Sequence, residues 1–311
     1  MNLPISVIIP HYNRPDRIER ALASVRSQTM QPAEIVLVDD FSRQECREDL
    51  RRFEGEATII WLPENSGSAN ARNEGVRACR CDTVAFLDDD DEWLPEKLEK
   101  QWAVLDGNPD LAASTTAIVV VDTHSGEKLS EMHSRPGTAI TLPMALESTP
   151  AMNQTLMIRK SAFLALGGFD PSFRNMQDHE FMIRLAASGI SNCHLAEPLS
   201  RYRVGDADQV TNLWKRMLQA RLNVIEKHRG LYEEVFGPGG ARLARGAHLR
   251  WAGTRRGGLQ GRAAFAYGAW LGRDWRAISR LVLTGKMCGP EYSRLHGGTA
   301  ERPFCSASSH T

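Results

Sequence analysis

The first part of the chain alternates between short, continuously apolar runs and segments long enough for a helix. Apolar residues at helical spacing follow Pro15, and Pro95 suits the first position of a further helix. Continuous apolar strands, each separated by a helix or a long crossover, are typical of a parallel sheet covered on both faces. We therefore predict an α/β fold with a mostly parallel central sheet flanked by helices. The expected strands are Ile5–Ile9, Ile35–Val38, Thr58–Leu62 and Thr83–Leu87, and the expected helices begin near Pro15, Ser68 and Pro95.

The second half of the chain is less regular, and its elements are read from shorter patterns. Glycines mark helix ends, and an apolar stripe at helical spacing marks the longest helix. The clearest break is Gly237–Gly240, and the last dozen residues are expected to be disordered. The expected elements are strands at Ala117–Val121 and Thr155–Ile158, and helices at Phe163–Leu166, Asp178–Ala187, Val210–Phe236, Ala263–Leu271 and Trp275–Leu283.

The neutral net charge is the sum of two unlike regions. Lys and Arg total 38, as do Asp and Glu, yet residues 237–311 hold 12 basic and only 3 acidic side chains. An acidic body with a basic tail indicates regions with different partners. No stretch approaches the roughly 20 apolar residues that span a bilayer. Since no secretory signal follows Met1, we expect a cytoplasmic protein with reduced cysteines.

Charged residues follow the expected strands at the points where the strands end. The first strand leads into Pro10–Arg14, the second into Asp39–Asp40 and the fourth into Asp88–Glu92. In open α/β sheets, ligands bind beyond the carboxyl ends of the strands. The acidic run is either a solvated turn before the next helix or a site where carboxylates share Mg²⁺ or Mn²⁺ with phosphate oxygens. Its position directly after an apolar strand favours the metal site.

Five motifs stand in register along the chain. They are Pro10–Arg14, Val38–Ser42, Asn65–Gly67 with Ala71–Asn73, Phe86–Trp93, and Gly167–Asp170 with Gln177–Glu180. Together they resemble a family 2 glycosyltransferase with the GT-A fold, over residues 3 to about 203. The resemblance implies a catalytic domain over residues 1–204, with a nucleotide-sugar and metal half (1–110) and an acceptor half (111–204). Residues 205–311 then form a helical, basic C-terminal region with a disordered end.

The resemblance implies five contacts to the nucleotide-sugar outside the acidic run. Pro10 and Tyr12 would line the nucleobase pocket, with Tyr12 stacking on the base. Asp40 would accept a hydrogen bond from the imide of uracil or thymine. Arg14 would contribute a cation, and Arg72 would reach the base or the diphosphate. Taken alone, Tyr12 would more often be a packing residue, and Arg72 a surface arginine.

Metal binding, ribose binding and catalysis are implied for four carboxylates. Asp88 and Asp90 match the two acids of the family's DXD motif and would hold Mn²⁺ or Mg²⁺, while Asp89 would contact the ribose. Asp178 matches the catalytic base, although aspartate is also among the best helix N-caps and a helix is expected to begin there. Asp39 belongs to the Val38–Ser42 motif. For this residue we favour capping of the turn after its strand over contact with the ligand.

The implied activity is transfer of a sugar from a UDP- or dTDP-sugar to a glycan or lipid-linked hydroxyl, with inversion, in polysaccharide or glycolipid biosynthesis. One alternative is a nucleotide-sugar-binding protein without turnover, because Gln177 and His179 depart from the family pattern, as does Gly205. A nucleotidyltransferase would usually carry a Gly-rich loop and a lysine after the first strand. A receiver-like signalling domain would not explain the downstream motifs.

Residues 241–302 are rich in arginines and aromatic residues. They form either a helical appendage whose aromatics pack on the catalytic domain, or a basic amphipathic surface that docks on anionic lipid headgroups. The second reading predicts peripheral contact with the inner face of the membrane. No nucleic-acid-binding motif is recognisable, so no nucleic-acid partner is expected. The arginines include Arg242, Arg245, Arg250, Arg255, Arg256, Arg262, Arg273, Arg276 and Arg280, and the aromatics include Trp251, Phe265, Tyr267, Trp270 and Trp275.

Overall fold

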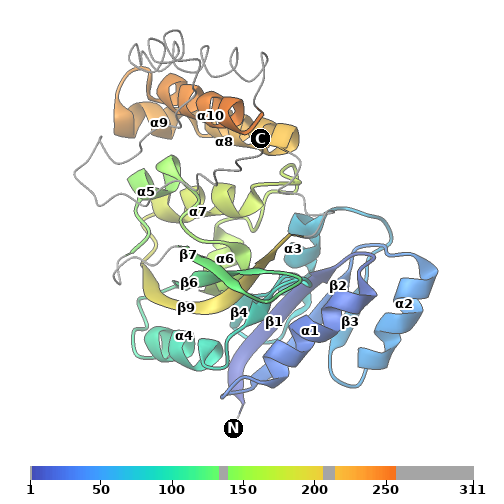
Figure 1. Ribbon diagram of the computed structural model, residues 1–311. Helices are drawn as coiled ribbons and strands as arrows, with labels where there is room; N and C mark the ends of the chain where they lie inside the picture. The colour runs from blue at the N-terminus through green and yellow to red at the C-terminus, as the bar shows by residue number, and fades with distance from the viewer. Residues whose placement is uncertain (1, 133–138, 206–213, 257–311) are drawn as a thin grey trace. The chain divides into compact units, whose positions relative to one another are not determined.

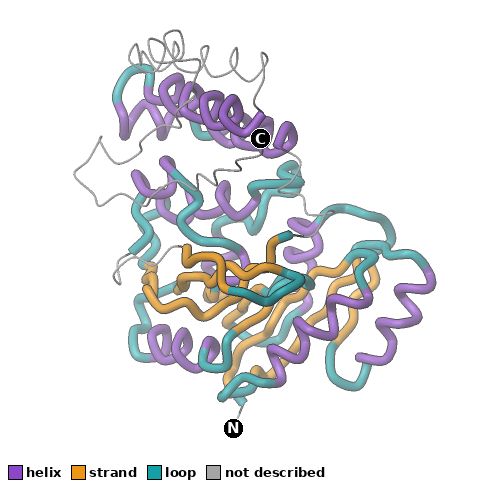
Figure 2. Tube along the Cα trace, viewed as in Figure 1, coloured by secondary structure: helices purple, strands orange, loops and turns teal. Residues whose placement is uncertain are grey.

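A computed structural model of the protein describes residues 2–132, 139–205 and 214–256. The chain divides into two compact units, residues 1–212 and 213–311, which are described separately. In the first unit the strands form one layer with helices around it (Figure 2). No helix within the described ranges is long and apolar enough to cross a membrane.

The first unit contains one mixed sheet of nine strands within the described residues, in the order β3-β2-β1-β4-β8-β6-β9-β5, with β7 paired to β6 (Figure 1). The strands are β1 (Leu3–His11), β2 (Pro32–Asp39), β3 (Thr58–Trp61), β4 (Thr83–Phe86), β5 (Glu92–Trp93), β6 (Ala113–Asp122), β7 (Lys128–Met132), β8 (Met157–Arg159) and β9 (Asn192–Val204). The helices of this unit are α1 (Pro15–Arg26), α2 (Gln44–Leu50), α3 (Ser68–Ala78), α4 (Lys97–Asp106), α5 (Leu142–Glu147), α6 (Lys160–Ala165) and α7 (Gln177–Ala187), with 3₁₀ turns at Arg51–Phe53 and Asn153–Thr155.

The parallel sheet predicted for the first half is confirmed, and the second half completes it with mixed pairings. Strands β3, β2, β1 and β4 are parallel neighbours. Strand β8 is antiparallel to both β4 and β6, whereas β9 is parallel to β6 and antiparallel to β5. The strand expected to begin at Thr155 begins at Met157, because Asn153–Thr155 forms a 3₁₀ turn in which the Thr155 N–H bonds to the Met152 carbonyl at 3.0 Å.

Alternate residues of β1 point to opposite faces of the sheet, and helices cover both faces. Val7 and Ile9 lie in one apolar cluster with residues of α1 and α4. Ile8 faces α3, which approaches so closely that a Cβ at Gly75 would lie 2.5 Å from the Ile8 side chain. Only glycine permits this packing, which fixes α3 behind the sheet (Figure 1).

Helix α1 begins at Pro15 as predicted, and its apolar face, Ile18, Ala21, Leu22 and Val25, is buried. The helix predicted to begin at Pro95 is α4, and it begins two residues later. Residues 94–97 form a turn in which the Lys97 N–H bonds to the Leu94 carbonyl at 3.1 Å, so α4 begins at Lys97.

Four phenylalanines join β4 to α6 and α7. Phe86 of β4 contacts Phe163 of α6 and Phe169, and Phe181 of α7 completes the cluster, with ring centroids 5.0–5.4 Å apart. Tilted and edge-on aromatic pairs of this kind add specific geometry to apolar burial. The cluster therefore fixes the start of α7 relative to the end of β4.

Lys97 is wholly buried, with its Nζ atom 4.3 Å from the centroid of the Trp93 ring and a hydrogen bond to Gln101 Oε1. Burial lowers the pKa of this lysine from 10.5 to about 7. In the unfolded chain the group keeps its ordinary pKa. Between these two values the unfolded chain therefore holds a proton that the folded chain has released, and folding becomes more favourable as the pH rises.

We expect the wild type to gain stability over Lys97→Met as the pH rises from 7 to 10, by at most about 1.4 kcal/mol per pH unit. Methionine does not titrate, so the difference between the two proteins isolates Lys97. Urea unfolding of both proteins at pH 7, 8.5 and 10 measures it. A difference in unfolding free energy that stays constant over this range would contradict the lowered pKa.

The described part of the second unit is helical, with α8 (Trp214–Lys227), α9 (Arg229–Phe236) and α10 (Gly240–Arg256). The single helix expected up to Phe236 is therefore two helices, which part at His228. The predicted break at Gly237–Gly240 is confirmed, since Gly237 and Gly239 adopt φ angles of 77° and 92°. The start of the expected helix at Val210 and the helices expected at 263–271 and 275–283 lie outside the described residues.

Candidate active site

The loops that follow β1 and β2 are tied together at the carboxyl edge of the sheet. The Asp40 N–H bonds to the His11 carbonyl at 2.8 Å. The Asn13 N–H donates to Ser42 Oγ at 2.9 Å, and the Arg43 N–H donates to Asn13 Oδ1 at 2.8 Å. The first two motifs therefore form one platform.

Two of the predicted base contacts lie on this platform and differ in exposure. Pro10 is a buried residue of β1, whereas the Tyr12 side chain is 46% exposed. That exposure does not fit the alternative in which Tyr12 is a packing residue. A ring left open at the carboxyl end of a strand is available for stacking.

Asp39 and Asp40 have different structural partners. Asp39 Oδ2 accepts from the Ser42 N–H at 3.1 Å and from Arg47 Nε at 2.7 Å, so the turn-capping prediction is confirmed. Asp40 Oδ1 and Oδ2 each accept a backbone N–H, from Ser66 and Gly67, both at 2.8 Å. Asp40 therefore joins the second motif to the third, and its predicted bond to a base stays a prediction.

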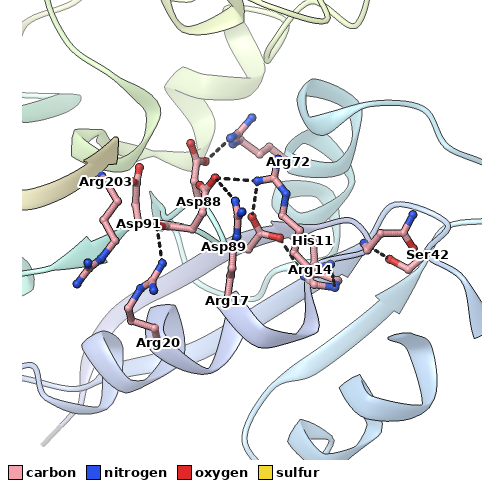
Figure 3. A network of polar contacts seen from close by, with 12 residues as sticks. His11, Arg14, Arg17, Arg20, Ser42, Arg72, Asp88, Asp89, Asp91 and Arg203 are labelled. Atoms are coloured by element: carbon pink, nitrogen blue, oxygen red, sulfur yellow. Dashed lines mark hydrogen bonds and ion pairs between the residues drawn. The ribbon is translucent and has the colours of Figure 1, made fainter. Parts of the chain in front are cut away.

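Three arginines of α1 and its N-cap face the acidic run (Figure 3). Arg14 Nη1 lies 2.7 Å and Arg17 Nη1 3.5 Å from Asp90 Oδ2. Arg20 donates to the Asp90 carbonyl at 3.2 Å and lies 3.0 Å from Glu92 Oε1. Spacing of three residues puts these side chains on one side of the helix. They offset the repulsion among adjacent carboxylates.

Two residues of the first motif, His11 and Arg14, hold Asp89 in place. His11 is buried, and its Nδ1 lies 3.0 Å from Asp89 Oδ2, while Arg14 Nη1 lies 3.5 Å from Asp89 Oδ1. The Arg14 N–H donates to His11 Nε2 at 3.4 Å, which favours the tautomer whose proton on Nδ1 faces Asp89. The predicted contact of Asp89 with a ribose stays a prediction.

Arg72 of α3 forms an ion pair with Asp88 and is 2% exposed, so the alternative of a surface arginine is wrong. Its guanidinium also lies 5.8 Å from the centroid of the Phe169 ring. Two of its donor atoms, Nε and Nη1, are buried and have no hydrogen-bond partner among the described residues. Buried donors without partners are rare, and a bound anion would satisfy them.

Asp178 lies in the first turn of α7, close enough to Asp88 and Arg72 for both to shift its pKa. Burial has the largest effect on that pKa and raises it. A hydrogen bond from the His179 N–H at 2.8 Å lowers it, Asp88 raises it and Arg72 lowers it. The N-cap alternative is wrong, because Met176 in a left-handed conformation, with φ 64°, holds the N-cap position. The structure therefore brings the predicted base to the predicted metal ligand.

The departures from the family pattern have structural partners around α7. Gln177 Nε2 donates to Ser68 Oγ at 3.3 Å, which joins α7 to the first residue of α3. His179 is buried, and its Nε2 lies 2.7 Å from the Ala145 carbonyl in α5. Both side chains therefore position α7.

The sequence predicts that Asp88 and Asp90 bind a divalent ion. Their side chains supply suitable ligand atoms but form only part of a coordination shell. Carboxylate oxygens suit Mg²⁺ or Mn²⁺, which often take only one or two carboxylates and complete their shell with phosphate and water. No group of three metal-binding side chains gathers among the described residues. Burial, then the charges of Asp89 and Asp88, raises the pKa of Asp90 to about 6, against the lowering effect of Arg14 and Arg17. A cation at this position would relieve that repulsion.

Several contacts of the site were not predicted. Arg14, Arg17 and Arg20 follow one another at intervals of three residues, and this spacing could have indicated that they lie on one face of the helix. Arg203 of β9 could not have been found from spacing, because its bond to Glu92 at 2.6 Å depends on the pairing of β9 with the two-residue strand β5. Asp91 is buried beside these groups, and burial together with Asp90 and Asp88 raises its pKa well above the ordinary value.

Asn73 fastens the two halves of the site together. Its Nδ2 donates to the Phe169 carbonyl at 2.7 Å, and its Oδ1 accepts from the Phe169 N–H at 2.9 Å. The fit is tight, because a Cβ at Gly168 (φ 69°) would lie 2.6 Å from Asn73 Oδ1. A single amide side chain therefore satisfies both backbone groups of Phe169.

We expect Asn73→Ala to lower the free energy of unfolding by about 2–4 kcal/mol, because it leaves a buried N–H and a buried carbonyl without partners. Asn108→Ala is the matched control, since Asn108 is exposed and its side chain bonds to the Val104 carbonyl at 2.9 Å. That control should change stability by less than about 0.5 kcal/mol. Urea unfolding compares them, and equal effects would contradict the role of Asn73.

A separate groove of about 390 Å³ is lined by the start of β2, by residues 54–57 and by β3. Its lining includes Glu34, Glu54, Glu56 and Arg80. Three carboxylates against one guanidinium do not suit a diphosphate. The carboxyl edge, with Arg14 and Arg72, remains the candidate site.

The sequence matches the family model described as glycosyl transferase family 2 over residues 6–167. A Bacillus subtilis protein named as a teichuronic acid biosynthesis glycosyltransferase, TuaG, is 32% identical over 214 residues, which are 68% of this chain and 83% of that protein. The amylovoran biosynthesis glycosyltransferase AmsE of Erwinia amylovora is 28% identical over 64% of this chain and 76% of its own length. The matched stretch spans 61% of an uncharacterized glycosyltransferase of Haemophilus influenzae, at 29% identity over 58% of this chain.

Solved structures share the fold at lower identity. S. aureus TarS 1-349 in complex with UDP-GlcNAc has a TM-score of 0.60 and 16% identity, covering 92% of this chain and 93% of that one. The mannosyltransferase PcManGT from Pyrobaculum calidifontis, in complex with GDP-Man and Mn²⁺, has a TM-score of 0.57 and 20% identity, covering 91% and 86%. The sheet described above is thus of the GT-A type.

Proposed function

The chain belongs to glycosyl transferase family 2, and from that premise we propose that it moves a sugar from a nucleoside-diphosphate donor to a hydroxyl of a glycan or lipid-linked acceptor, with inversion at the anomeric carbon. The observation that carries the proposal is Arg72. It is buried, it pairs with Asp88, and two of its donor nitrogens lack partners among the described residues. An anionic diphosphate is a ligand that such a group would bind.

The donor would lie along the carboxyl edge of the sheet. Tyr12 would stack on the base, and Asp40 would accept from its imide, which favours a UDP- or dTDP-sugar. Arg14 and Arg72 would meet the phosphates, with Asp89 near the ribose. The UDP-GlcNAc complex of TarS supports a uridine donor, whereas the GDP-Man complex of PcManGT is the reason to include guanosine donors in any test.

Asp178 would act as the base. The acceptor hydroxyl gives its proton to an Asp178 carboxylate oxygen while its own oxygen forms a bond to the anomeric carbon. The bond from that carbon to the phosphate oxygen breaks, and its electron pair leaves with the nucleoside diphosphate. A single displacement inverts the anomeric centre. The raised pKa of Asp178 supports this role, because it makes the carboxylate a better proton acceptor.

Charge on the leaving group must be stabilised as it develops. Asp88 and Asp90 would hold Mn²⁺ or Mg²⁺, which when bound supplies positive charge to the diphosphate. Arg14 and Arg17 form ion pairs with Asp90 in this structure, so both side chains would have to release the carboxylate before an ion could bind to it. Arg72 would remain near the departing phosphates.

The relatives are named for teichuronic acid and amylovoran biosynthesis, and we place this chain in polysaccharide biosynthesis on that similarity. The decisive assay offers the purified protein UDP-, dTDP- and GDP-sugars with Mn²⁺ or Mg²⁺ and a lipid and glycan extract as acceptor. We expect release of one nucleoside diphosphate that depends on acceptor and falls with chelator. No release from any donor would refute the proposal.

Peripheral membrane contact through residues 237–311 stays a prediction, and only 237–256 of this segment lies in the described part of the chain. Flotation of the full chain and of residues 1–236 with vesicles of anionic and of neutral lipid tests it. Binding by the full chain to anionic vesicles alone is expected. Equal flotation of the two proteins would contradict a membrane role for this region.

A further inference from the structure

Two aromatic rings stand open at the edge where the donor is proposed to bind. Phe41 is 49% exposed and Tyr12 46% exposed, and among the aromatic side chains whose exposure the structure describes, these two alone are exposed. All the others are at least partly buried. Exposed apolar rings that gather at one place, rather than singly, mark binding surfaces.

The sheet register brings the two rings to neighbouring loops. His11 is paired with Asp39 in the parallel β1–β2 ladder, so Tyr12 follows one strand directly and Phe41 follows the other after a single further residue. Adjacent strands lie about 4.8 Å apart. The Asn13–Ser42 and Asn13–Arg43 hydrogen bonds fasten these loops to each other, so the rings keep their places.

The backbone of Phe41 is in a conformation that a bulky residue rarely adopts. Its φ angle is 64°, in the left-handed region, where glycine or asparagine fits with less strain. Burial does not explain the ring, because half of it is exposed. Arg47 lies on it with its guanidinium carbon 5.2 Å from the centroid, which holds the ring in place. A strained, exposed and immobilised aromatic residue is a feature that a ligand explains.

We propose that Phe41 is a second aromatic contact for the nucleobase, beside Tyr12, in the donor site. This inference rests on the proposed function, because it takes Tyr12 and Asp40 as the base pocket. Stacking on an aromatic ring suits any base, since every base has a π face. Phe41 therefore adds affinity for the nucleoside and leaves the choice of base to Asp40.

The test uses calorimetric binding of UDP, dTDP, GDP and inorganic pyrophosphate, each with Mn²⁺, to the full chain. Phe41→Asn should weaken binding of the preferred nucleoside diphosphate about tenfold, a loss typical of one stacked base. Pyrophosphate has no base, so its affinity should not change. Phe41→Tyr keeps a ring and should keep nucleotide affinity. Leu129→Asn, which alters an equally open apolar side chain at 46% exposure in β7, should bind as the wild type does.

Thermal unfolding supplies the second measurement. Because asparagine tolerates the left-handed conformation, Phe41→Asn should melt no lower than the wild type even as it loses nucleotide affinity. Unchanged nucleotide binding in Phe41→Asn would overturn the inference and leave the proposed function intact. Equal weakening of nucleotide and pyrophosphate would also overturn it, since the loop and not the ring would then be responsible. A folded wild type that binds none of the three nucleotides would overturn the proposed function, and this inference with it.

Discussion

Asp178→Asn should lower sugar transfer by about 10³-fold while donor binding stays close to the wild-type value. Asparagine keeps the size of the side chain and can still accept the hydrogen bond from the His179 N–H, which is 2.8 Å long in the wild type. What it loses is the ability to take a proton from the acceptor hydroxyl. Turnover measured as nucleoside diphosphate release, and donor affinity measured by calorimetry, separate these two effects.

Asp106→Asn is the matched control for that variant, because Asp106 is an exposed residue at the end of α4. It should transfer sugar at the wild-type rate. The pH profile gives a further check, since the raised pKa of Asp178 predicts that kcat/KM in the wild type increases with pH as the carboxylate ionises. Near-normal turnover in Asp178→Asn would remove Asp178 as the base.

Asp90→Asn should reduce metal-dependent transfer by about 10²–10³-fold, the size of effect seen when one group that stabilises transition-state charge is removed. The amide offers a weaker, neutral ligand and also loses its ion pairs with Arg14 and Arg17. A titration of activity against Mn²⁺ should show saturation in the wild type and a much higher requirement in the variant. Donor binding without metal should change far less.

Asp110→Asn, at an exposed position after α4, controls for the loss of one negative charge. If Asp90→Asn and the wild type respond to Mn²⁺ with the same midpoint and the same maximum rate, Asp90 does not hold the ion. Asp88 would then be tested in the same way, with the qualification that its loss also frees Arg72.

The first half of the fold could be predicted because its information is local. Strands β1, β2 and β4 are buried on both faces and therefore read as continuous apolar runs. Helix α1 carries its own start signal, Pro15, and a regular apolar stripe. The parallel order then follows from the crossovers between these strands.

The second half could not be predicted in the same detail because its strands depend on distant partners. Strand β9 is mostly half-buried and polar, and it becomes a strand by pairing with β6 over its whole length. Strand β5 has two residues, too few for any sequence pattern, and exists through its pairing with β9. Those pairings place Arg203 beside Glu92, and no spacing in the sequence indicated that these two side chains would be in contact.

The site residues were located by motif and not by geometry, so their partners came from the structure. The sequence assigns Arg72 and Asp88 to successive motifs, and the structure joins them in an ion pair. Asp178 was expected as either a base or an N-cap, and the left-handed Met176 excluded the N-cap. Phe41 passed unnoticed because its conformation, and not its residue type, is the unusual feature.

A crystal structure with a nucleoside diphosphate and Mn²⁺ bound tests the location of the donor site most directly. The base should lie on Tyr12 within hydrogen-bonding distance of Asp40, with the diphosphate between Arg72 and the ion on Asp88 and Asp90. Nucleotide density in the separate groove lined by Glu34, Glu54 and Arg80 would contradict the assignment of the carboxyl edge as the active site.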